Sequence, residues 1–177
     1  SMLVGLFILS ACVVVSVACP FNCSGHGTCQ PDDTCSCNTP FLPPACVDQW
    51  LGQVSFGQPV LVGRVASGSR AMFSIQVDWK DVYREVTLSS SAFGQVGVDF
   101  LMVAGTEYPT PAVWDWRARN GAPLVVDGLV EGTYTAALYN GSPQDVSLVT
   151  VEASQVGVCP NNCTQRGACG ADGVCAC

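Results

Sequence analysis

Six cysteines between residues 19 and 46 constrain this chain more than any other feature of its sequence. Their spacing is C-x3-C-x5-C-x5-C-x-C-x8-C. A segment this short has too little apolar surface to offset the conformational entropy of its chain, so covalent cross-links must hold it. We therefore expect residues 19–46 to form a disulfide-rich module of a protein that resides in an oxidising, extracellular setting.

The same spacing begins again near the end of the sequence. Residues 159–177 read C-x3-C-x5-C-x5-C-x-C and stop one cysteine short of the first pattern. The element Cys-Pro-x-Asn-Cys thus occurs at residues 19–23 and again at residues 159–163. This repetition predicts a unit of one disulfide-rich module and one larger domain, followed by a partial second module at residues 159–177.

Both cysteine clusters resemble EGF-like modules of the calcium-independent kind found in tenascin-like matrix proteins. The features that carry the resemblance are the Cys-x-Cys pair at residues 35–37 and the two glycines, Gly25 and Gly27, before the third cysteine. Spacing alone allows fifteen pairings of six cysteines. The resemblance implies the pairs Cys19–Cys29, Cys23–Cys35, Cys37–Cys46, Cys159–Cys169 and Cys163–Cys175.

We expect no metal site and no cofactor. His26 is the only histidine, and it does not lie at zinc-ligand spacing from the cysteines. The calcium-binding form of the EGF-like family carries acidic residues just before its first cysteine. This chain has Val17 and Ala18 there in the first module, and Gly157 and Val158 in the second.

The composition excludes one class of partner and favours one class of fold. Charged residues make up only 12% of the chain, against about 25% in ordinary globular proteins. The net charge is −7 and Lys80 is the only lysine, so we expect no nucleic-acid partner. Glycine, proline, serine, threonine and valine are frequent, and no long helical period occurs, which indicates all-β structure.

Residues 47–158 contain no cysteine and are long enough to form a core of their own. Phe73, Ile75, Val77 and Trp79 alternate with polar residues, which predicts a strand with one buried face. Turn signals such as Asn-Gly and Asp-Gly separate further runs of strand formers. These runs are residues 60–65, 83–88, 98–103, 112–117, 124–126, 134–138 and 146–151. The pattern predicts an antiparallel β-sandwich of the jelly-roll type.

This middle region resembles the bacterial pre-peptidase C-terminal domain and related jelly rolls. The residues that carry the resemblance are 63–68, 72–79, 98–103 and 131–139. Some members of that family bind calcium through acidic residues near the middle strands. Asp99 lies near such a position, but the rest of the acidic cluster is missing here, so the resemblance does not extend to a metal site.

The first 18 residues allow two interpretations. Residues 3–18 are almost entirely apolar, but the run is shorter than the ~20 residues that span a bilayer. Ser16-Val17-Ala18 is typical of a signal-peptide cleavage site, although no lysine or arginine precedes the run. Its valines have strong β propensity. Residues 1–18 are therefore either a signal peptide or an inter-subunit strand retained in the mature chain, and in both cases the mature chain has no membrane span.

Cys12 and Cys177 have no partner within the two modules. If residues 1–18 are retained, Cys12 of one subunit could pair with Cys177 of the next, and the apolar strand could add to a neighbour's sheet. Repeating that contact head to tail gives an open filament. The competing interpretations are a cleaved signal peptide that carries Cys12, or a fragment that ends before its sixth cysteine.

The sequence shows no catalytic constellation, and its candidate sites concern binding and modification. Trp114 and Trp116 would share one face of a strand, where two indoles can stack on a sugar or pack into the core. Asn140, Asn22 and Asn162 begin N-glycosylation sequons. Thr28 precedes the third cysteine in the context of O-fucosylated EGF-like modules. The proline-rich surroundings of Thr39 and Thr110 suit O-glycans.

These observations together predict a secreted, glycosylated protein that is not an enzyme. We interpret it as a structural building block of an extracellular fibre, appendage or matrix, which assembles head to tail with further copies of itself. Two alternatives remain open. One is a carbohydrate-binding adhesin or receptor ectodomain that contacts sugars through Trp114 and Trp116. The other is a non-catalytic accessory region of a secreted hydrolase.

Overall fold

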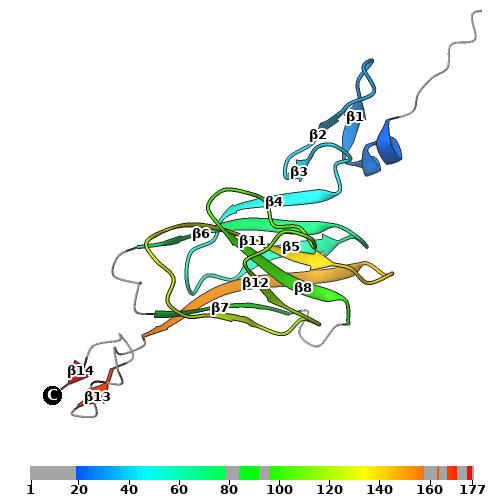
Figure 1. Cartoon of the computed structure of the whole chain (residues 1–177). Coiled ribbons are helices and arrows are strands. Elements are labelled where there is room, and N and C mark those ends of the chain that lie inside the picture. The colour runs from blue at the N-terminus through cyan, green and yellow to red at the C-terminus, as the bar shows by residue number, and fades with distance from the viewer. Residues whose placement is uncertain are drawn as a thin grey trace, which may run out of the picture.

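The computed structural model describes residues 19–78, 84–91, 96–157, 163, 167–170 and 175–176. Two sheets in this part of the chain face each other across a core (Figure 1). One has four strands in the order β10-β7-β12-β5, and the other has six in the order β3-β4-β6-β11-β8-β9. The prediction of an all-β sandwich is confirmed.

The elements follow the chain in this order: η1 (Pro20–Gly25), β1 (Gly27–Cys29), β2 (Cys35–Cys37), β3 (Phe41–Leu42), β4 (Asp48–Gln53), β5 (Val60–Val65), β6 (Arg70–Val77), β7 (Arg84–Ser90), β8 (Val98–Ala104), β9 (Trp116–Ala118), β10 (Leu124–Val126), β11 (Gly132–Asn140), β12 (Val146–Gly157), β13 (Ala168–Cys169) and β14 (Cys175–Ala176). Among the strands that the structure describes, the pairs are antiparallel except for β4 with β6, which is parallel.

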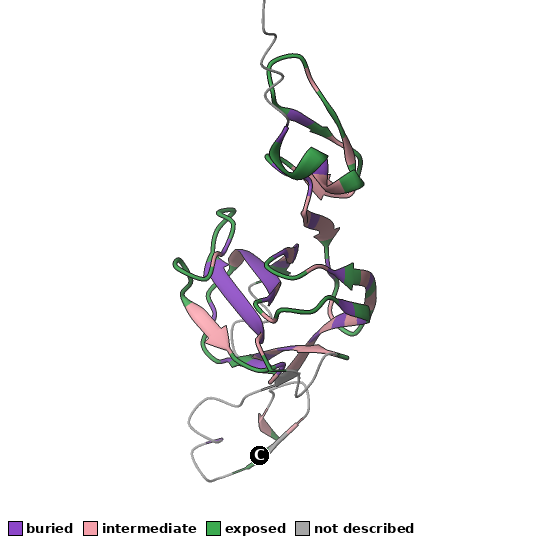
Figure 2. Cartoon of the chain, turned by 90° about the vertical axis from the view of Figure 1, so that its right-hand side faces the viewer, coloured by how far each residue is buried: buried purple, intermediate pink, exposed green. Residues whose placement is uncertain are grey.

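The core follows the alternation that the sequence predicts. Phe73, Ile75 and Val77 of β6 are fully buried, and the polar residues between them are at least partly exposed. They meet the buried face of β8 and β11 and, across the sandwich, buried residues of the four-stranded sheet such as Val86 and Leu88. Each large apolar side chain removed from water in this way contributes about 2 kcal/mol. Figure 2 shows this burial concentrated in the strands of the sandwich.

The outer face of the six-stranded sheet is also partly buried, which the alternation does not predict. Met72 and Leu101 point away from the main core yet are at most 1% exposed. The loop of residues 105–115 covers this face. Its Pro109 carbonyl accepts a hydrogen bond from Arg70 at 2.8 Å. Strand β8 is therefore buried on both faces along almost its whole length.

Two strand predictions need correction. The sequence does not predict strand β4, because the residues Asp-Gln-Trp-Leu-Gly-Gln have no clear alternation. The strand forms because it pairs in parallel with β6. The strand predicted at residues 112–117 is only β9, Trp116–Ala118. The chain leaves the ladder at Asp115, whose carboxylate accepts a hydrogen bond from the backbone N–H of Ala104 at 2.8 Å. Residues 60–65 and 124–126 are strands with the predicted bounds.

The N-terminal disulfide-rich segment, residues 19–46, has a core of sulfur rather than of aliphatic side chains. Its buried cluster consists of four cysteines, with Phe41 packed against it. The segment continues into the sandwich through strand β3, which pairs with β4 of the six-stranded sheet. The backbone N–H of Trp50 also donates to the carbonyl of Pro40 at 2.8 Å. Hydrogen bonds, not a free linker, therefore join the two parts.

A second disulfide-rich segment lies at the far end of the sandwich. Strands β13 and β14 pair there, close to the Cys163–Cys175 disulfide, at the end opposite β1 and β2 (Figure 1). Disulfides of this kind persist in oxidising compartments, so the chain belongs to an extracellular or periplasmic setting. In the part of the chain that the structure describes, no helix is both long and apolar enough to cross a bilayer.

Candidate functional site

A cleft lies where the N-terminal disulfide-rich segment meets the sandwich. Its volume is about 420 Å³, and its lining includes His26 and Phe41 on one side and Gln49, Val62 and Arg64 on the other. The rings of His26 and Phe41 stack with centroids 3.8 Å apart and planes within 7°. This junction cleft therefore combines an aromatic wall, an apolar floor and a few polar groups, which is the usual make-up of a binding site.

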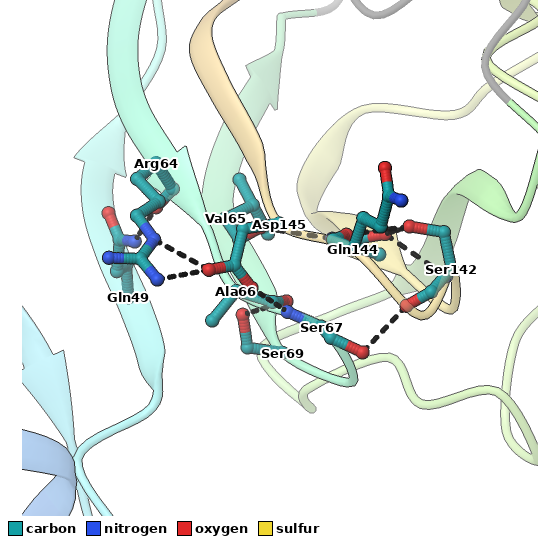
Figure 3. Close-up of polar contacts among 10 residues, drawn as sticks. Gln49, Arg64, Val65, Ala66, Ser67, Ser69, Ser142, Gln144 and Asp145 are labelled. Atoms are coloured by element: carbon teal, nitrogen blue, oxygen red, sulfur yellow. Dashed lines mark hydrogen bonds and ion pairs between the residues drawn. The ribbon is translucent and has the colours of Figure 1, made fainter.

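Strand β5 forms the sandwich side of the junction cleft. Gln49, which is 6% exposed, reaches across from β4 and donates from Nε2 to the carbonyl of Arg64 at 2.6 Å (Figure 3). The Arg64 guanidinium bonds in turn to Asp145 through both Nε and Nη2. The Ser67 backbone N–H donates to the same carboxylate, and it is the main cause that lowers the pKa of Asp145, with Arg64 second.

Asn140 is the centre of a buried polar cluster, and its predicted role needs correction. The sequon predicts an exposed acceptor on a turn, but Asn140 ends β11 and is fully buried. Its Nδ2 donates to the carbonyls of Val65 at 3.0 Å and Gln144 at 2.8 Å. Both amide hydrogens are therefore used, and an N-linked glycan at this nitrogen would have to replace one of them inside the fold.

Asp99 is held by a neighbouring arginine. Its Oδ2 accepts hydrogen bonds from Nε of Arg117 at 3.1 Å and from Nη2 at 2.5 Å. Its Oδ1 accepts one from the backbone N–H of Asn120 at 3.1 Å. Both carboxylate oxygens of Asp99 are thus engaged by donors of the protein itself, and one of these partners is a charged guanidinium.

Trp114 and Trp116 do not form the paired platform that strand geometry would give them. Trp116 opens β9 and points inward, where its ring packs edge-on against Tyr134 at 6.0 Å. Trp114 lies before the strand, is 41% exposed, and has the guanidinium of Arg117 5.8 Å from its ring centre. The prediction of two indoles side by side is wrong because the strand begins at Trp116, four residues later than predicted, so that Trp114 lies outside it.

The other predicted modification sites lie in varied surroundings. Asn22, Thr28 and Thr39 are exposed in the disulfide-rich segment. Thr110 is half-buried, and its hydroxyl accepts a hydrogen bond from the backbone N–H of Val113 at 3.0 Å. Asn162 lies outside the described residues. Glycosylation at these positions stays a prediction.

The cysteines pair as the sequence resemblance implies wherever the structure describes both partners. The bonds are Cys19–Cys29, Cys23–Cys35, Cys37–Cys46 and Cys163–Cys175. Cys159, Cys12 and Cys177 lie outside the described residues, and with them the predicted pairs Cys159–Cys169 and Cys12–Cys177. The sulfur atoms of Cys19, Cys23 and Cys35 lie within 4.8 Å of one another, but each is in a disulfide and so offers no thiolate to a metal.

Sequence reasoning missed the polar contacts on the sandwich side of the junction cleft. Gln49 and Arg64 lie on strands of different sheets, and Asp145 lies 81 residues beyond Arg64. Each is an ordinary polar residue in its local context. No spacing or motif in the sequence brings them together, so the contact follows from the sandwich alone.

Comparison with protein-family models finds no match, and comparison with curated proteins finds no relative. Two solved structures are similar to this chain. The first is PliG of Aeromonas hydrophila, a periplasmic inhibitor of g-type lysozyme, with a TM-score of 0.45 and 14% identity over 61% of this chain and 98% of that one. The second is the pre-peptidase C-terminal domain of a Bacillus anthracis collagenase, with a TM-score of 0.42 and 12% identity over 66% of this chain and 99% of that one. The second belongs to the family that the middle region resembles in sequence. Likeness at this level says nothing about activity.

Proposed function

We propose that this chain is a non-enzymatic building block of a secreted fibre, appendage or matrix, in which units follow one another head to tail. One observation carries the proposal: two segments of the same local structure lie at opposite ends of one sandwich. Figures 1 and 2, which differ by a 90° turn, both place them at opposite ends. A sandwich with similar segments at its two opposite ends is suited to serial assembly.

The likeness of the two segments is close in the residues that the structure describes. Cys23 and Cys163 both have left-handed backbone conformations, with φ of 52° and 54°. Each is bonded to a cysteine 12 residues further on. In each two-stranded sheet the pair nearest the turn consists of two cysteines, Cys29 opposite Cys35 in β1–β2 and Cys169 opposite Cys175 in β13–β14. This repetition supports an EGF-like module at each end, complete at residues 19–46 and partial at residues 159–177.

The junction between the first module and the sandwich supports a spacer role. Strand β3 of the module extends the six-stranded sheet, and Asp48, in the strand that pairs with it, bonds to Arg70 of β6 at 2.5 Å. Disulfides stiffen the module itself. In a rod of such units the orientation of one unit would fix that of the next, whereas a flexible linker would leave the angle between units free.

The charged groups fit a scaffold better than a catalyst. Three arginines that the structure describes, Arg64, Arg70 and Arg117, each bond to an aspartate of another strand or of a neighbouring turn. Their role is to fasten elements of the sandwich to each other. The carbohydrate-binding alternative required Trp114 and Trp116 to lie side by side on one exposed face. Because they do not, we do not favour it.

Assembly can be tested on the secreted chain in its oxidised form. We expect negative-stain electron microscopy to show end-to-end rods, and non-reducing gels to show ladders that collapse with thiol. Cys12→Ser should abolish the ladders if the Cys12–Cys177 link forms between subunits, while the matched change Ser10→Ala should leave them unchanged. Single particles at all concentrations, together with one monomeric band, would contradict the proposal.

A further inference from the structure

The junction cleft follows the open edge of strand β5. This strand is the last of the four-stranded sheet, and β12 is its neighbour there. Along this edge every second residue lines the cleft, namely Val62, Arg64 and Ala66. Because an extended chain rises about 3.3 Å per residue, these residues follow the cleft for about 13 Å. The cleft is therefore long enough for about four residues of an extended peptide.

The backbone of β5 has hydrogen-bonding groups on the side of the cleft. The ladder between β5 and β12 includes their neighbours in sequence but leaves out Val62 and Arg64. The Arg64 carbonyl points toward the cleft, because it accepts a hydrogen bond from the side chain of Gln49, which reaches across from β4. Unpaired backbone groups along the last strand of a sheet are a template for a further strand.

Gln49 supplies a polar atom that no protein group uses. The residue is 6% exposed, and its Nε2 donates to the Arg64 carbonyl at 2.6 Å. A carbonyl can only accept, so the amide nitrogen faces Arg64 and the amide oxygen, Oε1, faces away from it. In the part of the chain that the structure describes, Oε1 accepts no hydrogen bond, and it is not sealed off, since the Ser90 hydroxyl is the one wholly buried side-chain group there without a partner. A buried acceptor that opens onto the cleft favours a ligand with an N–H to donate.

The rest of the lining determines which peptide fits. Pro40 and Phe41 lie across the cleft from Val62, so apolar surface is present on both sides. Among the described residues that line the cleft there is no carboxylate, and the guanidinium of Arg64 is already paired with Asp145. A charged side chain bound there would lose water without gaining a partner. The cleft therefore favours an uncharged segment with apolar side chains at alternate positions.

We propose that the junction cleft binds an uncharged, extended segment of a different protein, which adds as a strand beside β5. The backbone of the segment pairs with Val62 and Arg64, and one of its N–H groups donates to Oε1 of Gln49. Its apolar side chains pack against Phe41 and Val62. The segment comes from a different protein rather than a second copy, because the described strands of this chain are already held in sheets. The inference does not depend on whether units form fibres.

Binding of a capped peptide, acetyl-Ser-Val-Ser-Val-Ser-Val-Ser-amide, to the full-length, oxidised protein tests the proposal. At saturation it should slow amide hydrogen exchange in residues 60–66 by about tenfold or more and leave the exchange of β6 and β11 unchanged. Two further peptides carry N-methyl groups, one on its valines and the other on its serines. Since alternate N–H groups of a strand point to opposite edges, one of these peptides should bind at least about tenfold more weakly than the other.

A pair of variants tests the role of the glutamine. Gln49→Met keeps the length of the side chain but removes its amide, and it should weaken peptide binding by about tenfold. Gln53→Met, at the exposed end of the same strand, is the matched control and should bind the peptide like the wild type. Both variants should keep the exchange of β6 and β11, which shows that the sandwich is intact.

Four outcomes would overturn the inference. The first is no binding of the unmodified peptide at about 1 mM. The second is equal binding of the two N-methylated peptides, because the contact would then not involve backbone pairing. The third is equal binding by the two glutamine variants. The fourth is protection of residues 60–66 that rises with protein concentration in the absence of peptide, since that would assign the edge to a second copy. None of these results depends on whether rods form.

Discussion

Replacing Asn140 should destabilise the sandwich far more than its place in a sequon suggests. The side chain is fully buried and makes four hydrogen bonds. Nδ2 donates to the Val65 and Gln144 carbonyls, and Oδ1 accepts from the N–H and the hydroxyl of Ser142. Together these bonds tie the end of β11 to the end of β5 and to the turn before β12, which belong to two sheets.

The magnitude follows from which partners lose their bonds in Asn140→Ala. The Val65 carbonyl becomes a buried acceptor without a donor, which costs about 1–3 kcal/mol. The Gln144 carbonyl lies 2.7 Å from the Ser142 hydroxyl, whose proton is free to bond to it once Oδ1 of Asn140 is gone, and Ser142 N–H is near water, so each adds at most about 1 kcal/mol. We therefore expect a loss of about 3 kcal/mol. Asn140→Asp should cost at least as much, because an oxygen then faces two carbonyls.

Urea unfolding of the oxidised protein, followed by tryptophan fluorescence, measures this loss. The midpoint should fall and the slope should stay constant, since the same surface is exposed on unfolding. Asn22→Ala, at an exposed asparagine of another sequon, is the matched control and should change stability by less than about 0.5 kcal/mol. An Asn140→Ala midpoint equal to that of the wild type, or a glycan found on Asn140 in the folded protein, would refute the reasoning.

Three further predictions follow from the structure. Asp145→Asn should reduce the loss of stability at acid pH, because the hydrogen bond from Ser67 lowers the pKa of Asp145. The stabilisation by the Asp145 carboxylate is present above its unfolded pKa and is lost as the pH falls through its folded pKa. Urea midpoints of wild type and variant measured from neutral to acid pH check this, and midpoints that fall in parallel with pH would contradict it. Reducing the disulfides should raise hydrogen exchange in residues 19–46 while the cysteine-free sandwich stays protected, and loss of protection in both parts would show that the sandwich depends on the module. Trp116→Ala should cost about 2–3 kcal/mol and Trp114→Ala less than about 1 kcal/mol in the same urea assay, whereas equal effects would mean that both rings pack alike.

Patterns that repeat along the chain could be predicted from the sequence. The alternation at residues 73–77 identifies β6 and its inward face, because side chains in a strand point to opposite faces in turn. The cysteine spacing identifies residues 19–46 as a segment that needs covalent cross-links. The pairing itself came from a family resemblance, since spacing leaves many pairings open. In each case the decisive signal lies within a few residues.

The tertiary structure alone decided which distant residues meet. Asn140 reads as a turn residue in sequence, yet it bonds to a carbonyl 75 residues earlier. Trp116 is a core residue because β9 pairs with β8, while Trp114, two residues before, is not. The junction cleft exists because β5 ends one sheet opposite β3 and β4 of the other. The local sequence determines which side chains of a strand point toward the core, because they alternate between its two faces. Only the packing of the two sheets determines which residues those side chains contact.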